Sequence, residues 1–523
     1  MRAALLFALL CFAPVAPASP LVLLGNVTAR PSAAQLAWMA KEVGVMITFN
    51  LQSLCVSAGA ANASAQACQV DTLRVPTLAA IREWSPPALD TDAWLAAAAS
   101  FGAKYAVLTA AHMTGFALWP TRAHNVSMAA TPWRGGRGDV VADFVASAAR
   151  ANMSAGLFYS THFNWVLGVN EYRVGWPRLY GGAPLTQAAY EDLVLLQLKE
   201  LAAYAPFEVW YDGGVNLSAT PRVGAAVRAL FPDAICHSCA GFSEAAPGPG
   251  AGRAVRWMGN EEGAMPLPSW AAADSATIAP PGSPVGDVFA PPSCDTVLAE
   301  HFWFFQPGED ARLRSTCALA NVYLTSVGRA SNLILNMAPG PSGAILPAEA
   351  AAYAALGAAV ACLWAAPLGA WAGLPLDAAT GAAAVAAAVA CPPSGCALTA
   401  VLQEELAAGG QRIAAWTLEA CLVDAAAGGG GGGGGDAACA AGVWADALPA
   451  ATPAAAATGV GHKRILALRT PPGKSVAALR FTARSAYAWA GGGDPPLILA
   501  RLELFDRANA SACVPQGCVL VDY

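Results

Sequence analysis

Short apolar runs alternate with longer helical segments from about Gln35 to Leu356, and this alternation constrains the fold of the chain most strongly. The short runs are typical of buried strands, and the segments between them have helical spacing. Such βα alternation over a stretch of this length predicts an α/β fold, a parallel sheet closed into a (β/α)8-like barrel. A doubly wound open sheet is the alternative, although no Gly-x-Gly-x-x-Gly fingerprint follows an early strand.

Individual elements of the barrel can be placed by residue number. We expect strands at 105–109, 156–160, 207–212, around Ile235 and at 255–258, and helices at 139–150, 187–204 and 223–230. After about Cys362 the helical spacing weakens, and short strand candidates follow at 400–402, 412–416, 463–468, 478–482 and 497–505. This change predicts a catalytic domain at 20–360 and a C-terminal antiparallel β-sandwich at 361–523. The glycine run at 428–435 is expected to be a disordered loop of the sandwich.

The first 19 residues combine one positive charge, an apolar core and small residues, which predicts a cleaved secretory signal peptide. We therefore expect a secreted or extracellular protein, with a vacuole or lysosome as the alternative compartment. Six Asn-x-Ser/Thr sequons agree with a glycoprotein. No later stretch has the length of bulky apolar residues that membrane insertion needs. The net charge of −6 without a basic cluster argues against nucleic acid as a partner.

Cysteine usage agrees with an oxidising compartment. The chain has 14 cysteines, and removal of Cys11 with the signal peptide leaves 13, an odd number that requires at least one free thiol. Plausible local disulfides are Cys55–Cys68, Cys391–Cys396, Cys421–Cys439 and Cys513–Cys518. Cys236-His237-Ser238-Cys239 resembles a redox or zinc pair, but no second ligand pair follows at the spacing of a zinc site. We therefore expect no bound metal.

The apolar run at 207–212 ends at Asp212 and is followed by Gly213 and Gly214. A barrel strand delivers its last side chain to the carboxyl-end mouth, where barrel enzymes keep their catalytic groups, and glycines let the backbone turn away. This pattern makes Asp212 a candidate catalytic carboxylate. The alternative is a strand-ending aspartate that caps the next helix or begins a turn.

Three expected strand ends carry many aromatic and hydrogen-bonding side chains, in the segments 111–120, 159–165 and 256–263. Aromatic faces together with convergent polar groups suit a sugar, because its C–H faces stack on rings and its hydroxyls need fixed partners. For any single tryptophan or histidine in these segments, core packing is the alternative role.

Several spaced motifs in one order resemble the α-L-fucosidases of glycoside hydrolase family 29, from about Pro31 to Ile345. The family's lysine-histidine-histidine-aspartate-glycine-phenylalanine block corresponds to 111–120, and its tryptophan-x-x-glycine-x-glycine-aspartate block appears at 133–139. The segments 325–336 and 340–343 are also close to the family pattern. The segments 402–413 and 458–465 resemble the family's C-terminal sandwich.

The resemblance implies that Asp212 is the nucleophile of a retaining mechanism and that Glu261 is the acid/base. The segment 257–261 is similar to the block that supplies this glutamate in the branch preferring α-1,3 and α-1,4 linkages, with Glu262 as the competing choice. No cofactor is implied. The implied substrate-binding residues are His112, Trp119, Tyr159, Trp210 and Trp257.

Four positions depart from the family pattern: Thr48 and Met113 replace histidines, Thr114 replaces an aspartate, and Ser293 replaces a glutamate. A lost buried hydrogen bond is worth about 1–3 kcal/mol. Two main hypotheses follow. The first is a secreted retaining α-L-fucosidase that acts on fucosylated oligosaccharides or glycoproteins, and the second is a fucosidase-like lectin that has lost turnover. A third is an exo-glycosidase for a related sugar. Retention of both candidate carboxylates favours an enzyme.

Overall fold

The structure is a computed structural model that describes residues 20–54, 76–216, 220–240, 252–278, 280–300, 302–424, 439–440, 442–449, 457–491, 493–507 and 512–521. The expected signal peptide, the Cys55–Cys68 pair and the glycine run at 428–435 lie outside these described residues. Within the described residues, no helix has the length and hydrophobicity needed to cross a bilayer.

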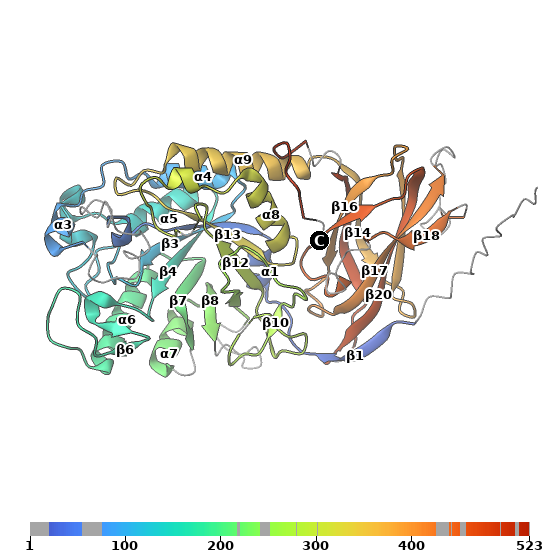
Figure 1. The fold of residues 1–523 in the computed structure, drawn as a ribbon. Coiled ribbons are helices and arrows are strands. Elements are labelled where there is room, and N and C mark those ends of the chain that lie inside the picture. Colours follow the sequence, from blue (N-terminus) through green and yellow to red (C-terminus); the bar gives the residue numbers. More distant parts are fainter. Residues whose placement is uncertain are drawn as a thin grey trace, which may run out of the picture.

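The predicted barrel is confirmed. Eight parallel strands close into a barrel in the order β12-β13-β2-β3-β4-β7-β8-β9, on the left of Figure 1. Their bounds are β2 (Val43–Ile47), β3 (Tyr105–Ala111), β4 (Ser154–Ser160), β7 (Glu208–Asn216), β8 (Ile235–Ala240), β9 (Ala254–Trp257), β12 (Pro292–Thr296) and β13 (Asn332–Met337). Both faces of β2, β3 and β13 are buried, as expected where helices cover a parallel sheet.

Helices surround this barrel, and polar caps explain where several of them begin. Asp139, predicted as the first residue of a helix, is the N-cap of α5 and accepts a hydrogen bond from the amide of Ala142 at 2.8 Å. The other predicted helices are confirmed as α6 and α7. The helix bounds are α1 (Ala33–Met39), α3 (Leu78–Glu83), α4 (Thr91–Ser100), α5 (Val140–Arg150), α6 (Gln187–Ala202), α7 (Pro221–Leu230), α8 (Thr316–Ser326) and α9 (Pro347–Leu363).

Two short antiparallel pairs and several 3-10 turns lie outside the barrel sheet. The pairs are β5 (Val169–Asn170) with β6 (Arg173–Val174) and β10 (Ala272–Ala273) with β11 (Val288–Phe289). The turns are η1 (Leu51–Leu54), η3 (Met128–Ala130), η4 (Trp133–Gly136), η5 (Trp165–Leu167) and η6 (Glu309–Arg312). β5 and β6 follow β4, and β10 and β11 follow β9, so both pairs belong to connections that leave the carboxyl ends of barrel strands.

The C-terminal segment forms the predicted sandwich, on the right of Figure 1. One sheet has the order β1-β20-β17-β18 with β15 on β20, and the other has the order β14-β21-β16-β19. The bounds are β1 (Val22–Val27), β14 (Pro367–Pro375), β15 (Ala382–Val389), β16 (Ala397–Glu404), β17 (Ile413–Asp424), β18 (Val443–Asp446), β19 (Arg464–Arg469), β20 (Lys474–Trp489) and β21 (Ile498–Asp506). Its apolar core includes Trp416 stacked on Phe481.

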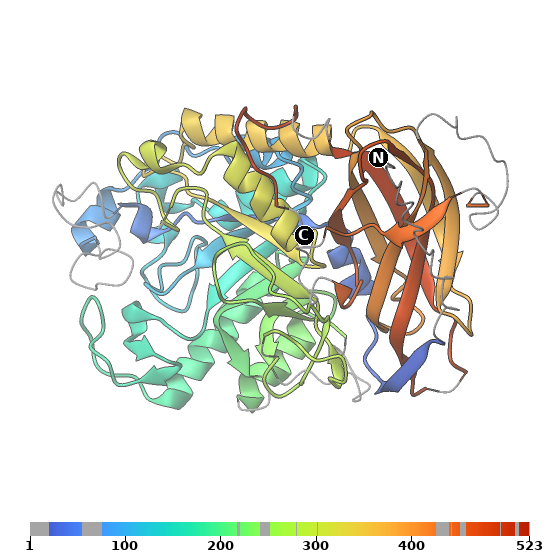
Figure 2. The ribbon, with the colours of Figure 1, turned by 45° about the vertical axis from the view of Figure 1, so that its right-hand side comes forward.

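Both ends of the described chain connect the two domains. Although residues 20–360 were expected to form the catalytic domain, β1 pairs with β20 of the sandwich, and Figure 2 shows it beside that sheet. In the opposite direction, the C-terminal segment returns to the barrel helices through the disulfides Cys317–Cys518 and Cys362–Cys513. The domains are therefore joined by crossing chain segments as well as by the connection after α9.

The two predicted disulfides within the sandwich are confirmed, and the one at the C-terminus is not. Cys391–Cys396 and Cys421–Cys439 are confirmed, whereas the predicted Cys513–Cys518 bridge is wrong because each of these cysteines bonds to a barrel helix instead. Cys236 and Cys239 form a disulfide with each other. The expected free thiol is present at the buried Cys294.

Candidate active site

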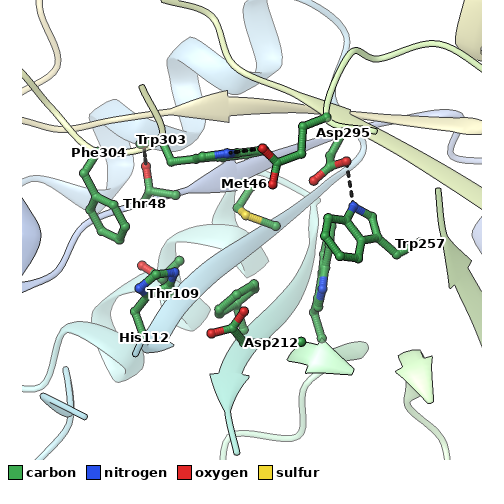
Figure 3. Close-up of a pocket in the computed structure, with 13 residues that line it drawn as sticks. Met46, Thr48, Thr109, His112, Asp212, Trp257, Asp295, Trp303 and Phe304 are labelled. Atoms are coloured by element: carbon green, nitrogen blue, oxygen red, sulfur yellow. Dashed lines mark hydrogen bonds between the residues drawn. The ribbon is translucent and has the colours of Figure 1, made fainter. Parts of the chain in front are cut away.

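A cavity of about 100 Å³ opens at the carboxyl ends of the barrel strands. It brings together five of the seven predicted site residues, which are His112, Trp210, Asp212, Trp257 and Glu261. Figure 3 shows Asp212 and His112 on one side of the cavity and Trp303 and Asp295 on the other. The remaining lining residues are Met46, Thr48, Thr109, Phe158, Gly213 and Phe304.

The local backbone of β7 explains how Asp212 reaches this cavity. The strand does not stop at Asp212 as expected. It pairs with β4 up to Asp212, bulges away from β8 after Trp210, and resumes that pairing at Val215. Gly213 lies in the bulge at φ +69°, and a Cβ there would approach the ring of His162 to 2.9 Å. Glycine is therefore required beside the carboxylate for conformation and for space.

The carboxylate of Asp212 has one oxygen available to a ligand. Its Oδ2 is buried and has no hydrogen-bond partner among the described residues. Buried polar atoms are almost always satisfied in folded proteins, and an exception marks a functional position. Structural capping, the alternative role for this aspartate, would give this oxygen a backbone amide partner.

His112 lies at the same side of the cavity and is held by ring contacts and one hydrogen bond. Its ring stacks on Phe158 and meets Phe304 edge-on. The Gln52 side-chain amide donates to its Nδ1 at 2.8 Å, which leaves the proton of the neutral ring on Nε2. Burial lowers the pKa of His112, and the negative charge of Asp212 acts in the opposite direction. The site thus contains a neutral imidazole that can donate a hydrogen bond.

Glu261 lies on the exposed rim and is oriented by two hydrogen bonds. The indole Nε1 of Trp303 donates to its Oε2 at 3.1 Å, and the Thr296 hydroxyl donates to its backbone carbonyl at 2.9 Å. Its backbone has a φ of +53°, an uncommon value for a residue with a side chain. Glu262, the competing choice, is exposed and does not line the cavity.

A third carboxylate, Asp295, was not singled out from the sequence. It is 3% exposed, and its Oδ1 accepts a hydrogen bond from Trp257 Nε1 at 2.7 Å, drawn as a dashed line in Figure 3. The pKa of Asp295 is raised to about 7, mainly by burial; the hydrogen bond from Trp257 opposes this rise, and the charge of Glu261 adds to it. The signal in the sequence is the pair Cys294-Asp295, which directly follows the departure at Ser293.

Trp303 and Phe304 are two further cavity residues that the sequence interpretation missed. The signal was present, because residues 302–305 are four consecutive aromatic side chains that follow β12. A sequence reading assigns such a run to core packing, and Phe302 and Phe304 are indeed buried. Only the tertiary structure places Trp303 over Glu261.

Trp119 and Tyr159, predicted to bind substrate, lie elsewhere. Trp119 Nε1 donates to Glu200 Oε2 at 2.9 Å, and Tyr159 Oη donates to Gln197 Oε1 at 2.8 Å. Both acceptors belong to α6. The two side chains therefore turn outward from the sheet toward the helix layer, and neither lines the cavity.

The four departures from the family pattern have different environments. Thr48 lines the cavity, but its hydroxyl donates to backbone carbonyls, including that of Trp303, and accepts from Asn336 Nδ2 at 2.8 Å. Thr114 donates to Asn50 Oδ1 at 3.3 Å, and Ser293 is fully buried. Met113 lines a different cavity. None of the four side chains therefore gives the cavity the hydrogen-bonding group that the family pattern has at its position.

Among the described residues, no cluster of three or more His, Cys, Asp or Glu side chains is arranged to hold a metal ion. The cysteines of the Cys-x-x-Cys motif are bonded to each other and are not available as thiolate ligands.

Comparison with known proteins confirms the resemblance found in the sequence. Residues 77–238 match the family model described as Alpha-L-fucosidase. The chain is 30% identical over 335 residues to "Putative alpha-L-fucosidase 1" of Oryza sativa subsp. japonica, covering 60% of this chain and 56% of the relative. It is 27% identical over 282 residues to "Alpha-L-fucosidase 1" of Arabidopsis thaliana, covering 50% and 49%. The aligned region thus spans about half the length of each curated relative.

Solved structures share the fold. A putative α-L-fucosidase from Bacteroides thetaiotaomicron superposes with a TM-score of 0.70 at 23% identity, covering 92% of this chain and 99% of that chain. A glycoside hydrolase 29 family member from an unknown rumen bacterium gives 0.67 at 21% identity, covering 92% and 78%. A Ruminococcus gnavus fucosidase in complex with fucose gives 0.64 at 16% identity, covering 93% and 97%. Each superposition covers more than nine tenths of this chain, so the shared fold extends over both the barrel and the sandwich.

Proposed function

From the α-L-fucosidase match over residues 77–238, we propose that this chain is a retaining exo-glycosidase that hydrolyses α-L-fucosyl linkages in glycans. Asp212 is the nucleophile and Glu261 is the acid/base. The substrates are fucosylated oligosaccharides or glycoproteins.

The observation that carries the proposal is the buried Oδ2 of Asp212, which has no partner among the described residues and faces the same cavity as Glu261. A nucleophilic carboxylate needs one oxygen free to reach the anomeric carbon. A retaining pair also has to stand about 5–5.5 Å apart across the glycosidic bond. The location of both side chains on one cavity supports this pairing.

In the first step, an oxygen of Asp212 attacks the anomeric carbon while protonated Glu261 donates its proton to the leaving glycosidic oxygen. The carbon–oxygen bond to the leaving group breaks, and a covalent fucosyl ester forms. Trp303 holds Glu261 Oε2 at 3.1 Å, which leaves Oε1 for the proton transfer. In the second step, ionised Glu261 takes a proton from water, and the water oxygen attacks the anomeric carbon. The ester bond between that carbon and Asp212 breaks, and fucose leaves with its original anomeric configuration.

Aromatic and polar groups of the cavity suit the fucose ring. Trp210, Trp257 and Phe158 offer apolar faces, and His112 Nε2 offers a hydrogen-bond donor to a hydroxyl. The hydroxyl of Thr48 is committed to the protein, so it contributes shape more than hydrogen bonding.

The test is to assay the purified protein on an aryl α-L-fucoside and on fucosylated trisaccharides, with proton NMR of the first product formed. We expect the protein to release α-fucose as the first product, before mutarotation converts part of it into β-fucose. Initial formation of β-fucose would contradict retention, and hydrolysis of another aryl glycoside in place of the fucoside would favour the related-sugar hypothesis.

We further propose a preference for α-1,3- and α-1,4-linked fucose over α-1,2-linked fucose, because the segment 257–261 resembles that branch of the family. Comparing kcat/KM for the three linkages tests it. A higher value for the α-1,2 substrate would contradict the preference and leave the proposed hydrolysis intact.

The second candidate function, a lectin without turnover, is favoured by the replacements at Thr48 and Met113, neither of which gives the cavity a hydrogen-bond donor. Calorimetric binding of fucosylated trisaccharides without release of fucose would establish it. The two carboxylates on the cavity favour hydrolysis, because binding alone does not need them.

Secretion is also part of the proposal and rests on residues 1–19. Expression of the full chain in a eukaryotic secretory host should release the protein into the medium with a new N-terminus near residue 20. Retention in the cytosol with Met1 intact would contradict it.

A further inference from the structure

We propose that the Cys236–Cys239 disulfide, together with His237 between its cysteines, positions the candidate active site. The disulfide and the ring fix the bulge of β7 that carries Trp210 and Asp212. The inference rests on the proposed function and adds positioning residues to it. It also gives a role to the Cys-x-x-Cys motif, which the catalytic assignment does not use.

The disulfide joins the two positions of β8 that border the bulge of β7. Cys236 pairs with Val209 before the bulge, and Cys239 pairs with Val215 after it. Between these two pairs, residues 210–214 of β7 lie opposite a shorter segment of β8. The longer segment has to bulge out of the sheet. Because the disulfide ties the two flanking positions together, it keeps the shorter segment from stretching and so preserves the bulge.

The bulge packs directly against the loop that the disulfide closes. Ser238, inside this loop, has a φ of +60°, an uncommon value for a residue with a side chain. A Cβ on Gly214 of the bulge would lie 3.2 Å from the Ser238 carbonyl oxygen. The short ring formed by the disulfide restricts the conformations open to Ser238. We therefore expect loss of the bond to change this backbone contact.

His237 supports Trp210 from within the barrel. The two residues are direct neighbours across β8 and β7, so their side chains lie on the same face of the sheet. Their rings stack with centroids 3.7 Å apart and an angle of 23° between the ring planes. His237 is 0% exposed and is not among the residues that line the cavity, whereas Trp210 lines it. The imidazole is therefore a layer beneath the ring that is proposed to face the sugar.

The stack depends on the flat shape of the imidazole and not on its acid–base chemistry. Burial lowers the pKa of His237 to about 3, so the ring is neutral at neutral pH. Its Nε2 is buried without a hydrogen-bond partner among the described residues, and its Nδ1 lies 3.2 Å from the Ser238 hydroxyl oxygen. A phenylalanine ring could therefore replace the imidazole with the loss of a single hydrogen bond.

The disulfide is shielded from solvent. Cys236 is 3% exposed and Cys239 is 0% exposed, and soluble thiols exchange slowly with sulfur atoms that they cannot reach. This burial favours a permanent structural bond over the redox pair that the motif resembles.

The first experiment compares His237→Ala with His237→Phe and measures the affinity for free fucose by calorimetry. Binding of free fucose needs no turnover and depends on the cavity wall that Trp210 forms. His237→Ala removes the stacked ring and should weaken fucose binding by about five- to tenfold. His237→Phe keeps a ring against Trp210 and should stay within about threefold of the wild type. Unchanged affinity in His237→Ala, or equal losses in both variants, would overturn the role of the ring.

The second experiment removes the disulfide with the double variant Cys236→Ala/Cys239→Ala. The matched control is Cys391→Ala/Cys396→Ala, which removes a local disulfide of the sandwich. Both double variants should have a lower melting temperature. Only the first should lower kcat/KM for an aryl α-L-fucoside, by about tenfold or more, because Asp212 is displaced from its position at the anomeric carbon. Equal losses in the two double variants would reduce the bond to a general contribution to stability and overturn its positioning role.

Hydrogen exchange separates this inference from the proposed hydrolysis. Mass spectrometry should show faster exchange of the backbone amides at 208–216 in Cys236→Ala/Cys239→Ala than in the wild type, with the sandwich strands unchanged. This readout needs neither turnover nor sugar binding, so it remains valid if the protein hydrolyses no fucoside. Unchanged exchange at 208–216 would overturn the inference. If the double variant does not fold, the same measurement on His237→Ala and His237→Phe decides, with faster exchange expected only in His237→Ala.

Discussion

Two carboxylates, one in each domain, differ in whether backbone amides of the protein satisfy their oxygens. In the sandwich, Glu404 is 5% exposed and accepts hydrogen bonds from the backbone amides of Arg412, Ile413 and Gly461 at 2.6, 2.8 and 3.2 Å. In the barrel, Asp212 places a buried oxygen in a cavity without a partner among the described residues. A satisfied carboxylate fixes the backbone around it, whereas an unsatisfied one is available to a ligand.

The difference originates in the two architectures. The sandwich turns its strands back on one another, so a loop between β16 and β17 can wrap its amides around Glu404. The barrel strands all point their carboxyl ends to one face, where the backbone opens and side chains converge. We therefore expect substitutions at Asp212 to change chemistry and substitutions at Glu404 to change stability.

The largest expected effect is the loss of activity in Asp212→Ala, of roughly 10⁴-fold or more on every fucoside, because both steps need the nucleophile. Azide should restore part of the turnover and yield the inverted fucosyl azide. The melting temperature should stay near the wild-type value, since no hydrogen bond to Oδ2 is lost. Activity without azide, or a large drop in melting temperature, would contradict the assignment of Asp212 to chemistry and of Glu404 to stability.

The next effect is a leaving-group dependence in Glu261→Ala. Removing the acid should cost roughly 10²–10⁴-fold on natural glycans and much less on an aryl fucoside with an acidic phenol. Azide should give a product of retained configuration. Glu262→Ala is the matched control on the adjacent residue and should resemble the wild type. If Glu262→Ala shows the leaving-group dependence and Glu261→Ala does not, the acid/base is Glu262.

Glu404→Ala should act on folding. It leaves three backbone amides without their acceptor, at a cost of about 3 kcal/mol in the free energy of unfolding, measured by urea titration. The control is Glu405→Ala, whose partly exposed side chain accepts from the amides of Ala407 and Ala408, with an expected cost below about 1 kcal/mol. Turnover per folded molecule should be unchanged in both variants. Reduced turnover in folded Glu404→Ala would mean that the sandwich influences the site.

The smallest effect is a pH dependence of stability that arises in both domains. Burial raises the pKa of Glu208 to about 8 and those of Asp295 and Glu404 to about 7. Groups whose pKa is raised on folding stabilise fully below their unfolded pKa, and this contribution is lost as the pH rises through the folded pKa. The free energy of unfolding should therefore fall between about pH 7 and pH 8.5, above the ordinary histidine pKa of about 6.5.

Glu208→Gln provides the check on that slope. Glu208 is fully buried and accepts from Trp38 Nε1 at 2.7 Å, and the amide oxygen of glutamine can keep this bond. The variant should flatten the slope by at most about 1.4 kcal/mol per pH unit. A slope identical to that of the wild type would show that Glu208 is not protonated in the folded protein at neutral pH.

Much of the fold and part of the site could be predicted from local sequence. The periodicity of strands and helices is a property of neighbouring residues, so the barrel, the sandwich and helices such as α5 and α6 were placed correctly. The pattern of a strand, Asp212 and two glycines is also local, as is the segment that contains Glu261. The backbone conformation of these motifs is set by their own residues. They can therefore be recognised in the sequence without knowledge of the rest of the molecule.

Contacts between distant segments were decided by tertiary packing. Trp119 and Trp303 look alike as aromatic residues after barrel strands, yet one hydrogen-bonds to α6 and the other reaches Glu261. Cys513 bonds to Cys362, 151 residues away, in preference to its near neighbour Cys518. The sequence by itself determined which elements form and which residue types reach the strand ends. Which of those side chains face the cavity depends on how helices and loops pack on the closed barrel, because a side chain's direction is selected by the neighbours that bury it.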